Sequence, residues 1–228
     1  MSRTFADSVR NNALALFFGA IFVAALIGQA LTGVAVYNSE QIAHGLEEIS
    51  TVQYVTSSSF AVDVTENWQS EYLQFFLYIY ATVWFLQKGS PESKRLGRSG
   101  TESDEDQRVG SHADERSPTW VQQGGWRLAV YSRSLGLVMG AIFLTSLLAQ
   151  SIAGTSEYNE SQLRDFQDPI SWWGYTTSAE FWNRTLQNWQ SEFLAVASMV
   201  VLAIYLRQRG SPESKPVGSA HETTGAEG

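Results

Sequence analysis

The sequence predicts an all-α membrane protein with four transmembrane helices, supplied by two parallel tandem copies of a helical hairpin with partly helical outer loops. Two observations carry this prediction. The apolar residues of the 228-residue chain are gathered into four runs, which are separated by segments rich in Ser, Glu, Gly and Gln. The chain also matches itself without a gap when it is shifted by 121 residues, which carries residue 67 onto residue 188. An ungapped match over both hairpins indicates a duplicated structural unit.

Two motifs mark the repeat. Residues 67–71 and 188–192 both read Asn-Trp-Gln-Ser-Glu, and residues 89–94 and 210–215 both read Gly-Ser-Pro-Glu-Ser-Lys. We expect residues 1–94 to form the first repeat and residues 119–215 the second. Residues 95–118, rich in Gly, Ser and acidic side chains, are expected to be a flexible cytoplasmic linker, and residues 216–228 a disordered tail.

The first helix of each copy is defined by its lack of charge. Residues 13–36 and residues 134–155 contain no Asp, Glu, Lys or Arg. About 20 apolar residues suffice to cross the hydrocarbon core of a bilayer. We therefore predict spans over about residues 13–36 and 134–155. After the first span, Asn38 or Ser39 is expected to cap a short helix that continues to Ile49.

The second helix of each copy has a shorter apolar run. Residues 193–206 cover only about 21 Å at 1.5 Å per residue, short of the roughly 30 Å of a hydrocarbon core. The helix must recruit the turn before this run, so we predict spans over about residues 68–87 and 189–207. Serines at residues 57–59 and a capping box at residues 177–180 indicate the starts of these helices. Trp68 and Trp189 then become interfacial anchors.

Basic residues set the orientation. Two of them, Arg164 and Arg184, lie in the outer segments of a four-span arrangement. Those on the opposite side include Arg3, Arg10, Lys88, Lys94, Arg95, Arg98, Arg127, Arg133, Arg207, Arg209 and Lys215. Because cytoplasmic loops carry the excess of Lys and Arg, both termini and the linker are predicted to be cytoplasmic. The two copies then enter the membrane in the same sense.

Composition argues against several functional classes. The net charge of -8 disfavours a nucleic-acid partner, which needs clustered Lys and Arg. The chain has no cysteine, and its histidines, His44, His112 and His221, all fall outside the predicted spans, so no spanning helix offers an axial haem ligand. No phosphate-binding glycine loop and no nucleophile with a nearby base can be recognised. The sequence therefore predicts no catalytic residues, no metal site, no cofactor and no enzymatic activity.

Four polar residues form the candidate intramembrane site: Gln29, Glu71, Gln150 and Glu192. The glutamates end the two Asn-Trp-Gln-Ser-Glu motifs, and the glutamines are equivalent in the repeat. An ionisable group at membrane depth is costly and normally faces protein or water. A Gln-to-Glu hydrogen bond across helices, made twice around the pseudo-axis of the repeat, is the structural interpretation. Ion coordination, proton relay or ligand contact is the functional one.

The two paired motifs, each flanking a second span, resemble those of a bacterial multi-pass membrane protein family catalogued as a domain of unknown function. The resemblance covers roughly residues 5–215. It implies a protein of the bacterial cytoplasmic membrane, and it transfers neither an activity nor a site residue.

Three functional hypotheses follow. The first is a non-enzymatic scaffold or accessory subunit, whose partners are the lipid bilayer and either further copies of the chain or another membrane protein. The second is a small transporter or channel that uses the four polar residues. The third is an outer-face ligand-binding or sensor module built from the aromatic loop at residues 172–175, which reads Trp-Trp-Gly-Tyr.

Overall fold

The computed structural model describes residues 5–225, and every regular element within that range is helical. This confirms the all-α prediction. Arg3 of the orientation argument and residues 226–228 of the expected tail lie outside the described range. The elements are α1 (Phe5–Asn11), α2 (Ala13–Ala43), α3 (Thr51–Val55), α4 (Ser58–Trp84), the 3-10 helix η1 (Gly110–His112), α5 (Thr119–Gln123), α6 (Gly125–Tyr131), α7 (Ser134–Arg164), α8 (Trp172–Thr176) and α9 (Ala179–Tyr205).

The repeat is reproduced helix by helix. Helices α2, α3 and α4 correspond to α7, α8 and α9, and in each pair both ends are displaced by the same 121 residues. Side-chain caps are repeated as well. The hydroxyl of Ser57 accepts a hydrogen bond from the N–H of Phe60, and Ser178 accepts one from Phe181, each at 3.3 Å. The same local sequence therefore produces the same local structure twice.

The chain divides into two compact units. The first contains Met1–Val64 and Ile152–Tyr175, and the second contains Thr65–Ser151 and Thr176–Gly228. Helices α4 and α7 each run from one unit into the other, because the division falls within both of them. The units therefore do not coincide with the two copies of the repeat.

In the first unit, tyrosines from the short helices pack against glycines of the long ones. Tyr54 of α3 is 3% exposed and lies against Gly33 of α2, while Tyr175 of α8 is 1% exposed and lies against Gly154 of α7. A Cβ atom at Gly33 would lie 2.3 Å from the Tyr54 hydroxyl, and one at Gly154 would lie 2.5 Å from that of Tyr175. Only glycine leaves room for either ring.

Asparagine side chains close the outer loops of the same unit. Asn38 exchanges two hydrogen bonds with the backbone of Ile49, both at 2.9 Å. Its equivalent Asn159 does the same with Ile170, at 2.9 and 2.8 Å. The expectation that Asn38 or Ser39 caps a short helix is wrong, because α2 continues unbroken to Ala43 and the Asn38 side chain is used to hold the loop.

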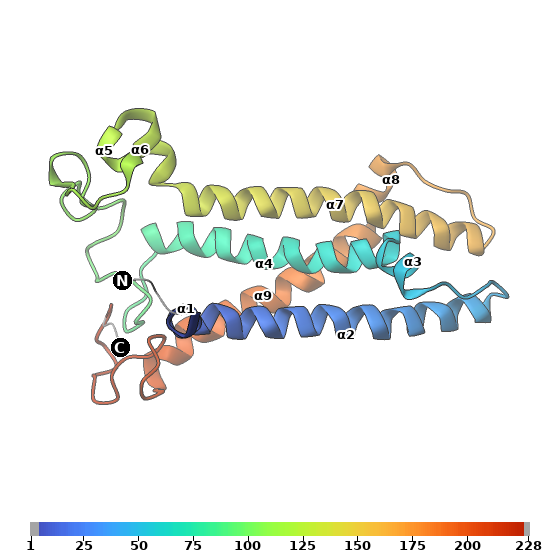
Figure 1. Ribbon diagram of the computed structural model, residues 1–228, viewed down its shortest axis with the longest axis horizontal. Coiled ribbons are helices and arrows are strands. Elements are labelled where there is room, and N and C mark those ends of the chain that lie inside the picture. The colour runs from blue at the N-terminus through green and yellow to red at the C-terminus, as the bar shows by residue number, and fades with distance from the viewer. Residues whose placement is uncertain (1–4, 226–228) are drawn as a thin grey trace. The chain divides into compact units, whose positions relative to one another are not determined.

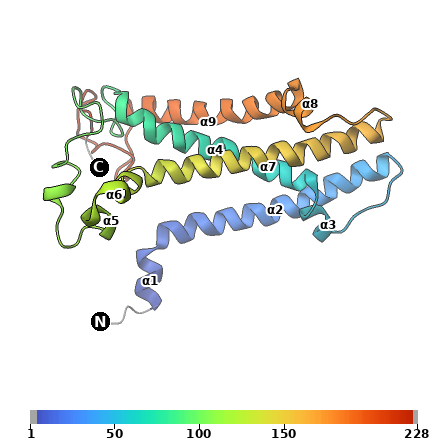
Figure 2. The same ribbon diagram turned by 90° about the horizontal axis from the view of Figure 1, so that it is seen from above.

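In the second unit, three long helices lie alongside one another: α9, the part of α4 from Thr65 and the part of α7 up to Ser151 (Figures 1 and 2). Rings of α4 pack against glycines of α7, with Tyr80 on Gly136 and Phe76 on Gly140. Polar side chains link α9 to both neighbours, as described below. This three-helix packing positions the candidate site.

Helices α4 and α9 end earlier than expected. The predicted spans reach residues 87 and 207, whereas the helices stop at Trp84 and Tyr205. Beyond these ends, the N–H groups of Gln87 and Gln208 bond the hydroxyls of Ser93 and Ser214, both at 2.9 Å. An N–H engaged by a downstream serine is not available to the helix, so the downstream loop fixes the helix end.

The number of apolar spans also differs from the prediction. Among the described residues, two helices rather than four are long and apolar enough to cross a membrane by length and composition, namely α2 and α7. Both extend well past the predicted limits at residues 36 and 155. Helices α4 and α9 do not qualify because their N-terminal halves are polar, with Asp63 and Glu66 in α4, and their apolar runs are short.

Replacing the tyrosine-facing glycines should destabilise the first unit. We expect Gly33→Ala and Gly154→Ala each to cost about 1–3 kcal/mol, the usual penalty for overpacking a closed site. Gly28 of α2 has nothing within 4 Å of its Cβ position, so Gly28→Ala is the matched control and should be neutral or stabilising. Thermal unfolding of the three variants in detergent measures the difference. Equal melting temperatures for Gly33→Ala and Gly28→Ala would contradict this packing.

Candidate functional site

The interior of the second unit is polar. Six side chains of α4, α7 and α9 carry amide or hydroxyl groups and are at most 5% exposed, and we call them the polar core: Gln69, Ser70, Ser146, Gln150, Ser151 and Thr185. Buried polar groups are costly unless they are hydrogen-bonded, so their partners define the site.

Two hydrogen bonds connect the helices through this core. The indole N–H of Trp189 on α9 donates to the amide oxygen of Gln69 on α4 at 2.8 Å. The amide nitrogen of Gln150 on α7 donates to the hydroxyl of Thr185 on α9 at 3.3 Å. Thr185 and Trp189 are one helical turn apart, so α9 bonds both neighbouring helices from adjacent positions.

Each of the two glutamines keeps one unused polar atom. Nε2 of Gln69 and Oε1 of Gln150 are buried and have no hydrogen-bond partner. Gln69 is 0% exposed and Gln150 is 1% exposed. A donor and an acceptor left in this state favour binding of water or another small polar molecule, because an unsatisfied buried group costs about 1–3 kcal/mol.

An ion pair connects the N-terminal part of α9 with that of α4. Nε of Arg184 lies 2.9 Å from a carboxylate oxygen of Glu66, and both side chains are largely buried. The other basic residue of the predicted outer segments, Arg164, approaches Glu160 at 3.8 Å. Both outer arginines are therefore engaged by glutamates.

Glu160 also orders the outer part of the first unit. It accepts a hydrogen bond of 2.7 Å from the hydroxyl of Tyr37 on α2. Burial, followed by the hydrogen bond and the charge of Glu160, raises the pKa of the Tyr37 hydroxyl above its usual value. Tyr37 therefore stays protonated and keeps donating throughout the physiological pH range.

The four residues of the candidate polar site occupy different environments. Gln150 is in the polar core and its amide nitrogen bonds Thr185, whereas Gln29 is half-buried on α2 in the first unit. Glu192 is half-buried and Glu71 is exposed. The amide nitrogen of Gln150 bonds Thr185 rather than a glutamate.

The two tryptophans expected at the interface also differ. Trp189 is half-buried and uses its indole N–H inside the unit, on Gln69. Trp68, its equivalent, is 40% exposed. In the aromatic loop, Tyr175 is the residue packed against Gly154, so this member of the predicted ligand platform has a structural role.

The Gly-Ser-Pro-Glu-Ser-Lys segments fold into matching turns, which we call the first and second GSPESK loops (residues 89–94 and 210–215). Ser90 and Ser211 each accept a hydrogen bond from the N–H of the loop glutamate, at 3.3 and 3.2 Å. The glycines that open the loops, Gly89 and Gly210, have φ values of +86° and +83°. This backbone conformation favours glycine, which accounts for the residue at that position.

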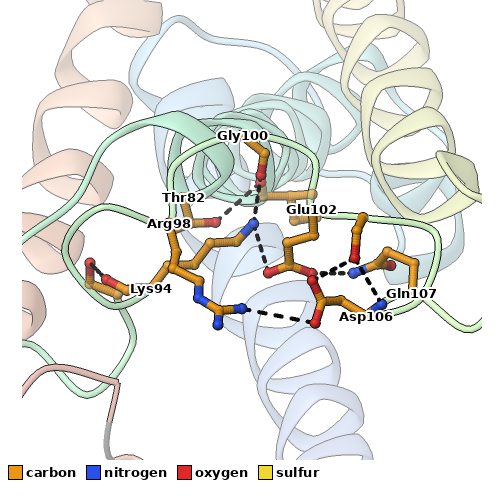
Figure 3. Close-up of polar contacts among 10 residues, drawn as sticks. Thr82, Lys94, Arg98, Gly100, Glu102, Asp106 and Gln107 are labelled. Atoms are coloured by element: carbon orange, nitrogen blue, oxygen red, sulfur yellow. Dashed lines mark hydrogen bonds and ion pairs between the residues drawn. The ribbon is translucent and has the colours of Figure 1, made fainter.

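The lysine of the first loop holds the segment that follows it. Nζ of Lys94 donates to the carbonyl of Gly100 at 2.8 Å and pairs with Glu102 at 3.0 Å (Figure 3). Hydrogen bonds from Lys94 and then from Gln107 lower the pKa of the Glu102 carboxyl. Residues 95–107, where the sequence predicts a flexible linker, thus form a turn around the lysine.

The lysine of the second loop is buried. Lys215 is 1% exposed, and its Nζ lies within 3.3 Å of four backbone carbonyl oxygens, those of Gly89, Ala220, His221 and Thr223. Burial, with a smaller contribution from the charge of Arg207, lowers the pKa of Lys215. The segment expected to be a disordered tail therefore wraps around this ammonium group and reaches the first GSPESK loop.

Gln69 and Thr185 were not singled out from the sequence. Gln69 lies inside the Asn-Trp-Gln-Ser-Glu motif, but a glutamine is less conspicuous at membrane depth than the glutamate two positions later. Thr185 lies outside both repeated motifs, and its equivalent in the first copy is Val64. A polar residue that replaces an apolar one between two copies is the signal that could have identified it.

Loss of the Lys215 ammonium should release the tail. We expect Lys215→Met to unpair four carbonyls, to cost about 2–4 kcal/mol, and to expose residues 219–225 to protease. Lys94→Met is the matched control, because Lys94 is partly exposed and bonds one carbonyl, so about 1 kcal/mol is expected. Limited proteolysis with mass spectrometry measures how strongly the tail is protected from cleavage. Equal protection of the tail in both variants would refute its anchoring by Lys215.

Comparison with known proteins gives a family but no function. A family model described as a domain of unknown function, DUF6766, matches residues 5–226. No curated protein and no solved structure matches the chain. The match covers nearly the whole sequence, including both copies of the repeat and both GSPESK loops. The chain therefore belongs to the DUF6766 family.

Proposed function

We propose that this protein is a four-span membrane protein of the bacterial cytoplasmic membrane that acts as a non-enzymatic scaffold or accessory subunit. The observation that supports it most is the distribution of side chains. In the second unit the buried positions are largely polar, while large apolar side chains such as Leu144, Leu148, Leu194 and Leu202 are at least half exposed. This distribution is unfavourable in water and favourable in a hydrocarbon solvent.

Helices α4 and α9 are the second spans in this proposal. Each has 27 residues and is about 40 Å long at 1.5 Å per residue, more than the roughly 30 Å of a hydrocarbon core. The polar N-terminal halves of these helices are not exposed only to lipid, because Gln69 and Thr185 are buried inside the unit and Arg184 pairs with Glu66. Helices too polar to cross a membrane by themselves can do so within a bundle.

A scaffold role is supported by α2. None of its most apolar 18-residue window is buried, although it is the most apolar helix in the described part of the chain. Such a surface suits lipid, a second copy of the chain or another membrane protein. The predicted orientation, with both termini and residues 95–118 in the cytoplasm, leaves α2 accessible to such partners within the bilayer.

The absence of cysteine makes the topology directly testable. Glu47, Glu105, Asp168 and Glu222 are all exposed, and each can be replaced singly by cysteine. In spheroplasts, a membrane-impermeant maleimide should label the variants at residues 47 and 168, and should reach those at residues 105 and 222 only after lysis. If only α2 and α7 crossed, residue 105 would be labelled and residue 168 protected, which would overturn the four-span topology.

Experiments in reconstituted liposomes distinguish the scaffold role from the transport alternative. Transport is supported by the glutamates Glu71 and Glu192 at equivalent positions of α4 and α9 and by the unpartnered amide atoms of the polar core. We expect the purified chain to be oligomeric or to retain a membrane partner, and to pass no more protons or monovalent cations than empty liposomes. Flux that disappears in Glu71→Gln/Glu192→Gln with the fold intact would establish transport. A monomer without a partner would refute the scaffold.

A further inference from the structure

A cavity of about 260 Å³ lies at the carboxyl end of α4, within the second unit. Its walls come from the last turns of α4, from two valines of α9 and from the first GSPESK loop. Most of the lining is apolar, including Phe85, Leu86, Val196 and Val200. The polar core does not contribute to this cavity, which is therefore separate from the candidate polar site.

One carboxylate faces this apolar lining. Glu92 of the first GSPESK loop is half-buried, and its carboxylate accepts a hydrogen bond from the hydroxyl of Tyr78. Both residues line the cavity. Lys94 of the same loop is directed to Gly100 and Glu102 instead of Glu92 (Figure 3). The cavity wall thus carries a negative charge beside apolar and aromatic groups.

The second copy does not reproduce this arrangement. Met199 occupies the position of Tyr78, and Glu213, the equivalent of Glu92, is exposed. The hollow beside the second GSPESK loop is lined by residues of that loop and those next to it, without a contribution from α9. The arrangement is therefore specific to the first copy, although the loop sequences are identical, and it arises from the tyrosine on α4.

We propose that this cavity binds a lipophilic organic cation, of the class of hydrophobic amines and quaternary ammonium compounds. The apolar body of the ligand packs against Leu86, Val196 and Val200, and its cationic head lies beside the carboxylate of Glu92. Binding sites of this kind combine apolar walls with a few placed polar groups. The rings of Tyr78 and Phe85 add the attraction of an aromatic face for a cation.

The volume suits a small member of this class. A cavity of about 150 Å³ holds a benzene molecule. The additional volume here accommodates a phenyl ring with a compact ammonium head. Benzyltrimethylammonium is therefore the probe, and neopentylbenzene, in which carbon replaces the charged nitrogen, is the neutral control of the same shape.

Binding of the two compounds to the full-length chain in detergent micelles tests the proposal by isothermal titration calorimetry. We expect benzyltrimethylammonium to bind and Glu92→Gln to weaken its affinity about tenfold or more, because one opposite charge near the cation is lost. The amide oxygen of glutamine still accepts the Tyr78 hydrogen bond, so the fold is expected to survive. Tyr78→Phe, which removes the hydroxyl and keeps the ring, should weaken binding by a smaller factor.

Glu213→Gln is the internal control. It removes the same charge from an identical loop sequence outside the cavity. Because the charge of Glu213 still reaches Tyr78, we expect Glu213→Gln to weaken the affinity for the cation much less than Glu92→Gln does. Equal weakening by Glu92→Gln and Glu213→Gln would show attraction to the acidic surface in general. Equal binding of neopentylbenzene, or undiminished binding by a correctly folded Glu92→Gln variant, would also overturn the proposal. Thermal unfolding of each variant establishes its folding.

Discussion

Hydrogen bonds between buried side chains of α4, α7 and α9 are the interaction on which the second unit depends. Gln69, Gln150 and Thr185 are almost completely buried, and two of the bonds between helices involve them. In an apolar solvent, lipid contacts do not favour one helix arrangement over another, so buried polar groups and small residues determine which helices meet. Glycines at residues 136 and 140 allow the close contact, and the polar groups fix the register.

Duplication operates at two levels in this chain. Local structure is copied faithfully: equivalent helices have equivalent ends, and asparagines, serines and loop lysines make equivalent backbone contacts. Contacts between the long helices of the second unit are not copied. Trp189 bonds Gln69 across the two copies, and Thr185 has a valine as its equivalent, so the two hairpins play different roles once they pack.

The features that the sequence predicts are those controlled by neighbouring residues. Serines at residues 57 and 178 start helices as expected, because their side chains bond an N–H three positions away. The ends of α4 and α9 were missed, since they depend on Ser93 and Ser214, which return from a loop six residues later. Internal symmetry suggested two Gln-to-Glu pairs, whereas Gln150 bonds a threonine on a different helix, a contact that only tertiary packing determines.

The burial of Lys215 changes where the folded domain ends. The amino-acid repeat and the last basic residue both suggest a boundary at this lysine. Its ammonium group, however, is surrounded by carbonyls from residues 220–223, and Gly225 donates a hydrogen bond to Ser90, which lines the cavity beside α4. A shortened chain ending at Lys215 would lose three of the carbonyl groups that accept hydrogen bonds from the ammonium group of this lysine. Expression vectors and fusion tags should therefore keep residues 216–225 intact.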